Sequence, residues 1–99
     1  MQSEPRWRTQ RHRQQHFLKH GIALGRATAD AYDQSARVTR RIGRRFTFTD
    51  VSTNEPRVGY YDLPARRLTV LTDDEMIIVT HFDCEESYVR RLPNSSYQR

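Results

Sequence analysis

The chain has 99 residues and a formal net charge of +5, a size that accommodates one domain with a modest core and excludes two independently folding units. A single cysteine, Cys84, excludes a framework of internal disulfides and favours a reducing compartment, where a buried and inert thiol is expected. No apolar run reaches membrane-spanning or signal-peptide length, so we expect no membrane partner and a cytoplasmic protein, or one delivered into a target cell's cytoplasm.

The first half of the chain predicts two helices. Residues 1–7 lack a periodic apolar pattern and are expected to fray, whereas good helix formers run from Arg8 to His20. Gly21 is expected to end this helix in the left-handed conformation. Thr28 can cap a second helix that Gly43 ends. The residues expected on its buried face are Tyr32, Ser35, Ala36, Thr39 and Ile42.

The second half predicts a sheet. The runs RFTFTD, RVGYYD, RRLTVL and MIIVTHF are rich in aromatic and β-branched residues, and turn residues separate them. We expect an α+β fold in which the N-terminal helices pack on a four-stranded antiparallel meander. The apolar stretch Met76–Val79 indicates a central, doubly buried strand. A short helix over Glu85–Leu92 ends before Pro93, which makes residues 8–92 one nuclease-like domain and 93–99 a loose tail.

The charge is distributed unevenly along the chain. Residues 1–45 contain eleven Lys and Arg against three Asp and Glu, whereas residues 46–99 contain six against nine. Clustered cations suit a polyanion, because each neutralised phosphate releases condensed counterions. The pattern favours a nucleic-acid partner, and a solvated basic face on an ordinary domain is the alternative.

Three histidines, His12, His16 and His20, are spaced four residues apart and share one side of the first helix. Such a stripe has three interpretations: a metal site, a solvated polar face, or acid–base chemistry. No second cluster of Cys, His and carboxylate has a matching spacing, so we expect no metal. A solvated face accounts for His12. Imidazole is the natural acid–base group near neutral pH, which keeps His16 and His20 as candidates.

The surroundings of His20 favour the chemical interpretation. Lys19 precedes it, Phe17 offers an apolar wall, and Gly21 would let a phosphate approach the backbone. RNA is cleaved without metal when its 2′-OH attacks the adjacent phosphate, provided that one group moves protons and cations stabilise the developing charge. One histidine and one lysine can do this, although a structural histidine in a basic helix is the alternative.

A second set of candidates lies on the expected strands. Thr80 and Phe82 share one face of the last strand, where a hydroxyl can bond a phosphate and an aromatic ring can stack on a base. His81 lies on the other face, where it is either exposed or catalytic, and we include it among the candidate contacts to substrate. Tyr60 could line a site, and Arg57 could reach a phosphate. The alternative for each is an ordinary packing role.

The run HFLKHGIALG, the helix expected from Thr28 and the final IIVTHF resemble the Barnase, EndoU, colicin and RelE nuclease superfamily, most of all colicin D type tRNase toxin domains and related contact-dependent or phage-borne nucleases. The resemblance covers roughly residues 14–92. Lys19 and His20 match a Lys-His pair before a glycine on the first helix. Thr80 and Phe82 match a Ser/Thr two residues before an aromatic on a late strand, with Thr in place of Ser and Phe in place of Trp.

The resemblance implies a metal-independent endoribonuclease of bacterial toxin type that cleaves tRNA or another structured RNA and leaves a 2′,3′-cyclic phosphate. It makes His20 the general acid/base and Lys19 the stabiliser of phosphate charge, with Thr80 and Phe82 holding the nucleotide. Related toxins often place a second histidine near the site, and His16 is that candidate. An acidic antitoxin or immunity protein would neutralise such a toxin, and no small-molecule cofactor is expected. A non-catalytic RNA- or DNA-binding module is the alternative, and a protein-interaction domain is a third possibility.

Overall fold

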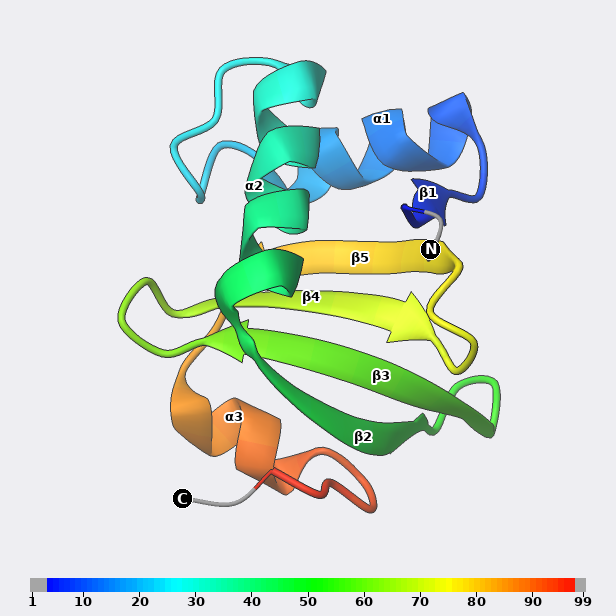
Figure 1. Cartoon of the computed structure of the whole chain (residues 1–99). Coiled ribbons are helices and arrows are strands. Elements are labelled where there is room, and N and C mark those ends of the chain that lie inside the picture. Colours follow the sequence, from blue (N-terminus) through cyan, green and yellow to red (C-terminus); the bar gives the residue numbers. More distant parts are fainter. Residues whose placement is uncertain (1–3, 98–99) are drawn as a thin grey trace.

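The computed structural model describes residues 4–97, which form an α+β fold with three helices and one five-stranded sheet (Figure 1). The expected α+β class is therefore confirmed. The elements follow in the order β1 (Arg6–Trp7), α1 (Gln10–His20), α2 (Ala29–Ile42), β2 (Arg44–Asp50), β3 (Glu55–Asp62), β4 (Arg67–Thr72), β5 (Ile77–Asp83) and α3 (Glu86–Arg91).

The sheet has the strand order β1-β5-β4-β3-β2. Strands β2 to β5 form the antiparallel meander that the sequence predicts, because short connections return each strand beside the preceding one. The expectation of a purely antiparallel, four-stranded sheet is nevertheless wrong. Strand β1 adds a fifth strand that runs parallel to β5, with Arg6 opposite Ile77 and Trp7 opposite Ile78.

Trp7 fixes the N-terminal segment. For residues 4–7, the expectation of a frayed end is therefore wrong. The Trp7 side chain is 7% exposed, stacks on Tyr32 and donates an Nε1–H hydrogen bond of 2.7 Å to Asp33. A large aromatic ring gains enough from burial to hold a short segment that has no periodic pattern. Residues 1–3 lie outside the described residues.

Strand β5 contains a β-bulge at Val79. Val70 of β4 pairs with Thr80, whereas the next residue, Leu71, pairs with Ile78, so Val79 is left without a partner in the register. An extra residue in one strand shifts every later side chain to the opposite face. Ile78 therefore faces the side covered by α2, and Thr80 faces the side covered by α3, although the two residues are only two positions apart.

The expectation that Met76–Val79 is a central strand buried on both faces is also wrong. Met76 precedes β5 and is exposed, and Ile77 is half-buried. Beyond β5 the described sheet has only the two residues of β1, so this end of β5 is close to an edge. Its apolar composition instead reflects Ile78, which is buried beneath α2, and Val79, which is half-buried against the core on the α3 side.

The two helices of the first half begin at threonine caps. Thr9 accepts a hydrogen bond from the backbone N–H of His12, so α1 begins at Gln10 rather than at Arg8. Thr28 caps α2 in the same way, as expected. The buried face of α2 holds Tyr32, Ser35, Ala36 and Thr39 as predicted, but Ile42 is 62% exposed, because it is the last helical residue and lies beyond the packed face.

Gly21 follows α1 in a right-handed conformation, so the expectation of a left-handed residue there is wrong. A Cβ at Gly21 would lie 2.5 Å from the Phe17 ring, and this close packing is the reason for glycine. The same packing buries Gly21, which removes the expected open backbone for a phosphate. The left-handed residue is Gly25, with a φ of 69°.

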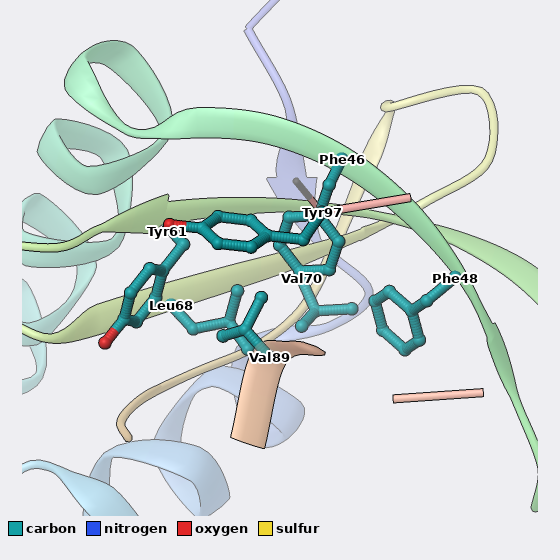
Figure 2. Packing of buried hydrophobic residues seen from close by; sticks show 7 residues of the cluster. All are labelled: Phe46, Phe48, Tyr61, Leu68, Val70, Val89 and Tyr97. Carbon is teal, nitrogen blue, oxygen red and sulfur yellow. The ribbon is translucent and has the colours of Figure 1, made fainter. Parts of the chain in front are cut away.

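The core occupies both sides of the sheet. On one side α2 packs over β3 and β4, and on the other α3 and the segment after it pack over β2 to β4, while α1 lies beside β5 (Figure 1). Figure 2 shows the second of these cores, in which Val89 of α3 lies against Leu68 and Val70. Tyr97 packs among Phe46 and Tyr61 in the same cluster.

Tyr97 also corrects the expectation of a loose tail over residues 93–99. Its ring is 7% exposed, and the preceding Ser96 exchanges backbone and side-chain hydrogen bonds with Thr47 of β2. The aromatic ring completes a core that one short helix could not cover. Residues 98 and 99 lie outside the described residues. Within residues 4–97 no helix has the length and apolar character needed to cross a membrane.

Candidate active site

The side-by-side position of α1 and β5 brings five of the sequence-predicted site residues to one hollow. The hollow has a volume of about 370 Å³. Helix α1 contributes the polar side chains of His16, Lys19 and His20, which lie on one side of the helix. Strand β5 contributes the hydroxyl of Thr80 and the ring of Phe82, which face the same side of the sheet after the bulge. The lining residues are His16, Lys19, His20, Val79, Thr80, Phe82 and Tyr88.

A hydrogen bond joins the two elements across this hollow. The Nδ1 atom of His16 lies 2.8 Å from the Oγ1 atom of Thr80. Because the other ring nitrogen of His16 is not used in this contact, the bond fixes the imidazole without consuming both of its nitrogens. The ring centroid of His16 lies 4.4 Å from that of His12 and 5.9 Å from that of His20, so the three imidazoles form a continuous row.

Both site histidines favour the neutral state. Burial lowers the pKa of His16 to about 4, and the charges of His12, His20 and Lys19 contribute to this lowering. Burial also lowers the pKa of His20, Lys19 adds to this effect, and the carboxylate of Asp83 opposes it. At neutral pH each imidazole is therefore uncharged and can accept a proton, which is the state that a general base requires.

Aromatic rings form the wall of the hollow next to His20. The Phe82 ring centroid lies 5.3 Å from that of His20 and 5.8 Å from that of Tyr88. Phe82 and His20 are half-buried and Tyr88 is 39% exposed, so part of each ring reaches solvent. A partly exposed aromatic surface beside imidazoles and an ammonium group can hold both a ring and an anion.

Tyr60 and Arg57 of β3 are not part of this hollow, which corrects their expected place at a common site. The hydroxyl of Tyr60 donates a hydrogen bond to Glu75 on the α2 side of the sheet. Arg57 is 6% exposed, and its guanidinium lies 3.7 Å from Asp50 and 3.8 Å from Glu55. Neighbouring residues of a strand face opposite sides, and β3 is two strands away from β5.

His81 is buried completely and takes no part in the hollow, so the expectation that it contacts substrate is wrong. Its Nδ1 lies 3.0 Å from the carbonyl oxygen of Leu68, and its Nε2 lies 2.8 Å from the hydroxyl of Ser35. Because a carbonyl only accepts, Nδ1 carries the proton and Nε2 accepts from Ser35. Burial lowers the pKa of His81 to about 4, and the neutral ring serves as a polar link between α2 and the sheet.

Sequence reasoning missed three residues of this region. Tyr88 lies on the short helix α3, where no pattern distinguishes it. His12 is expected on a solvated surface, yet it is half-buried with its ring 5.7 Å from that of Trp7. A tryptophan so close to a histidine stripe is the signal that could have predicted this contact. Val79 enters the lining through the bulge, which depends on pairing with β4.

A second, basic hollow of about 300 Å³ lies at the N-terminal end of α1. Four arginines and one aspartate line it, together with Trp7, Thr9 and Gln10. Arg13 and Arg37 bind carboxylates, Asp30 and Asp33 respectively, at 3.1 and 3.0 Å. The charged lining residues are Arg6, Arg8, Arg13, Asp33 and Arg37.

The thiol of Cys84 is half-buried, and burial raises its pKa to about 12, which keeps it protonated. No group of three or more His, Cys, Asp or Glu side chains within residues 4–97 is arranged to hold a metal ion. Comparison of the chain with family models, curated protein sequences and solved structures finds no significant match.

Proposed function

We propose that this chain is a metal-independent endoribonuclease of the bacterial toxin type. The observation that carries the proposal is the meeting of His16, Lys19, His20 and Thr80 in one solvent-accessible hollow beside the ring of Phe82. These residues come from two elements about 60 positions apart in the chain. Most of them also carry the resemblance to colicin D type nuclease domains, so the geometry and the resemblance support one site.

The chemistry follows from the state of each group. Neutral His20 accepts the proton of a ribose 2′-OH while the 2′-oxygen attacks the adjacent phosphorus. The ammonium of Lys19 stabilises the negative charge that develops on the phosphate oxygens. The bond from phosphorus to the 5′-oxygen then breaks, and the imidazolium of His20 returns its proton to that oxygen. The products are a 2′,3′-cyclic phosphate and a free 5′-OH, and no metal or cofactor enters the balance.

His16 and Thr80 take a positioning part in this scheme. Their hydrogen bond fixes α1 against β5 and thereby the distance between Lys19, His20 and the hydroxyl face of β5. When the Thr80 hydroxyl does not donate its hydrogen to His16, it can donate that hydrogen to a phosphate oxygen. Phe82 offers a face on which a base can stack.

The charge distribution supports RNA as the substrate. The basic hollow at the start of α1 is lined by four arginines, and it gives a polyanion a second place to bind away from the histidines. We propose tRNA or another structured RNA, in the cytoplasm of the producing or the invaded cell. An acidic antitoxin or immunity protein that covers the basic surface would neutralise the toxin.

The basic hollow is also the observation that favours a second candidate, a non-catalytic RNA- or DNA-binding module. In that case the arginines contact phosphates and the histidine row serves only to pack α1 on β5. The two candidates differ in what His20 does, because a binding module loses little when this half-buried ring is removed.

The test incubates purified protein with total tRNA in EDTA and compares the wild type with His20→Ala and Gln14→Ala. Gln14 is exposed on α1 and does not line the hollow, which makes it a matched control. We expect the wild type and Gln14→Ala to cleave, with a cyclic phosphate at the 3′ ends, and His20→Ala to lose roughly 10²- to 10⁴-fold in rate. Binding of tRNA without cleavage by the wild type would refute the enzyme and support the binding module.

A further inference from the structure

A third hollow adjoins the histidine site on the α3 side of the sheet. It has a volume of about 220 Å³, and its lining is mainly apolar. The end of β2, strands β4 and β5, and helix α3 all contribute to it. We name it the apolar slot and define it by Phe48, Asp50, Val51, Val70, Phe82 and Tyr88, the lining residues that matter here.

The apolar slot and the histidine hollow adjoin one another. Val79, Thr80, Phe82 and Tyr88 line both of them, so the slot lies beside Thr80. If a ligand binds with one group at Thr80 and His20, the part of the ligand next to that group would therefore lie at the slot. Three aromatic rings, those of Phe48, Phe82 and Tyr88, surround the slot, and such a lining suits a flat, weakly polar ring.

We propose that the apolar slot binds one nucleobase of the RNA strand, on the nucleotide next to the cleaved phosphate. This rests on the proposed function, because that function supplies the phosphate at Thr80 and His20. A nucleobase is flat, joins the phosphate through one ribose, and stacks on aromatic side chains. No other part of an RNA strand has an apolar face of this kind.

Asp50 gives the slot a preference among bases. Its Oδ1 accepts hydrogen bonds from the backbone N–H of Ser52 at 2.9 Å and from the Ser52 hydroxyl at 2.7 Å, which fixes the carboxylate. Hydrogen bonding from Ser52 also lowers the pKa of Asp50, so at neutral pH the group only accepts. Adenine, cytosine and guanine each present an exocyclic amino group to such an acceptor, whereas uracil presents only its N3–H, which lies between two carbonyl oxygens that a carboxylate repels. Uracil is therefore the disfavoured base.

The binding test uses the His20→Ala protein and 3′-nucleoside monophosphates, followed by amide NMR. We expect shifts at Val51 and Tyr88 with 3′-AMP, 3′-CMP and 3′-GMP, and weaker binding of 3′-UMP and of ribose 5-phosphate, which has no base. Tyr88→Ala should weaken binding roughly ten- to a hundredfold, because it removes a stacking surface, whereas Tyr88→Phe should retain it. Val38→Ala on α2, far from the slot, is the control that should change nothing.

Asp50→Asn tests the base preference. The amide of asparagine also donates a hydrogen bond, so the variant should bind uracil as readily as the other bases. If ribose 5-phosphate binds as tightly as the nucleotides, or if Val51 and Tyr88 do not respond to them, the slot proposal fails. A cleavage assay separates this failure from that of the proposed function. If RNA is cut equally fast whether or not the nucleotide beside the cleaved phosphate has a base, the slot proposal fails and the nuclease proposal stands. If the protein binds nucleotides at the slot but cuts no RNA, the nuclease proposal fails and the slot proposal stands.

Discussion

The imidazole of His16 and the hydroxyl of Thr80 lie within hydrogen-bond distance, 2.8 Å, although 64 positions separate them in the chain. This contact holds helix α1 against strand β5, and the other residues of the histidine hollow are arranged around it. One hydrogen bond thus links the packing of the N-terminal helix to the geometry of the candidate site.

Replacing Thr80 by valine should affect activity more than stability. The change leaves the half-buried Nδ1 of His16 without its partner, which costs about 1 to 2 kcal/mol in the free energy of unfolding. We expect the cleavage rate to fall at least tenfold and Thr80→Ser to restore most of it. Urea unfolding and single-turnover cleavage of an RNA oligonucleotide measure the two effects. Equal activity of Thr80→Val and wild type would show that the bond does not position the site.

The pKa of His20 should be visible by NMR titration of its ring protons. Because burial and Lys19 lower this pKa, the midpoint should lie below 6.5, and kcat/KM should fall as the pH decreases through it. Lys19→Gln removes one cause and should raise the midpoint. An unchanged midpoint in this variant would mean that Lys19 and His20 do not interact. Arg66→Gln, on the turn between β3 and β4, is the charge control and should leave the midpoint unchanged.

Stability should fall in mild acid because of His81. Its pKa is about 4 in the fold, against 6.5 as the ordinary value, so the unfolded chain takes up a proton first as the pH falls. The stability that His81 contributes is complete above pH 6.5 and is lost progressively down to pH 4, a loss of about 3 kcal/mol.

Urea unfolding at pH 7, 5.5 and 4 measures this loss. His16 contributes in the same direction, since its pKa is also lowered to about 4, so His16→Gln should reduce the dependence and leave the part due to His81. Stability that does not change between pH 7 and pH 4.5 in His16→Gln would contradict a neutral, buried His81.

The basic hollow should control the salt dependence of RNA binding. In the His20→Ala background, Arg6→Gln together with Arg8→Gln should weaken tRNA binding and reduce the slope of log K against log salt by about 0.7 to 0.9 for each phosphate that the variant no longer neutralises. Filter binding between 50 and 200 mM salt measures the slope. If the double variant behaves like Arg66→Gln, the hollow binds no phosphate.

Trp7 should stabilise the fold although the sequence around it lacks a pattern. Trp7→Phe keeps most of the packing but removes the Nε1–H hydrogen bond to Asp33, which costs about 1 kcal/mol, and Trp7→Ala should cost about 3 to 5 kcal/mol. Thermal or urea unfolding followed by circular dichroism gives these values. An unaffected Trp7→Ala protein would restore the interpretation of residues 4–7 as a frayed end.

Local patterns were sufficient for much of the fold. Helical spacing and the threonine cap predicted α2, and two-residue alternation with intervening turns predicted the meander of β2 to β5, because both signals depend on neighbours in the chain. The ends of the chain were mispredicted for the same reason. Trp7 and Tyr97 are fixed by distant partners, Asp33 and the Phe46 cluster, and a single aromatic residue produces no periodicity.

The candidate site divides in the same way. The sequence by itself determined that His16 and His20 share one side of a helix and that Thr80 and Phe82 face away from His81, since these relations follow from the repeats of a helix and a strand. It could not determine which side of the sheet they face. The bulge at Val79 decides this, because it depends on the register between β4 and β5, and it turns Thr80 and Phe82 toward the histidines of α1 while His81 is buried beneath α2.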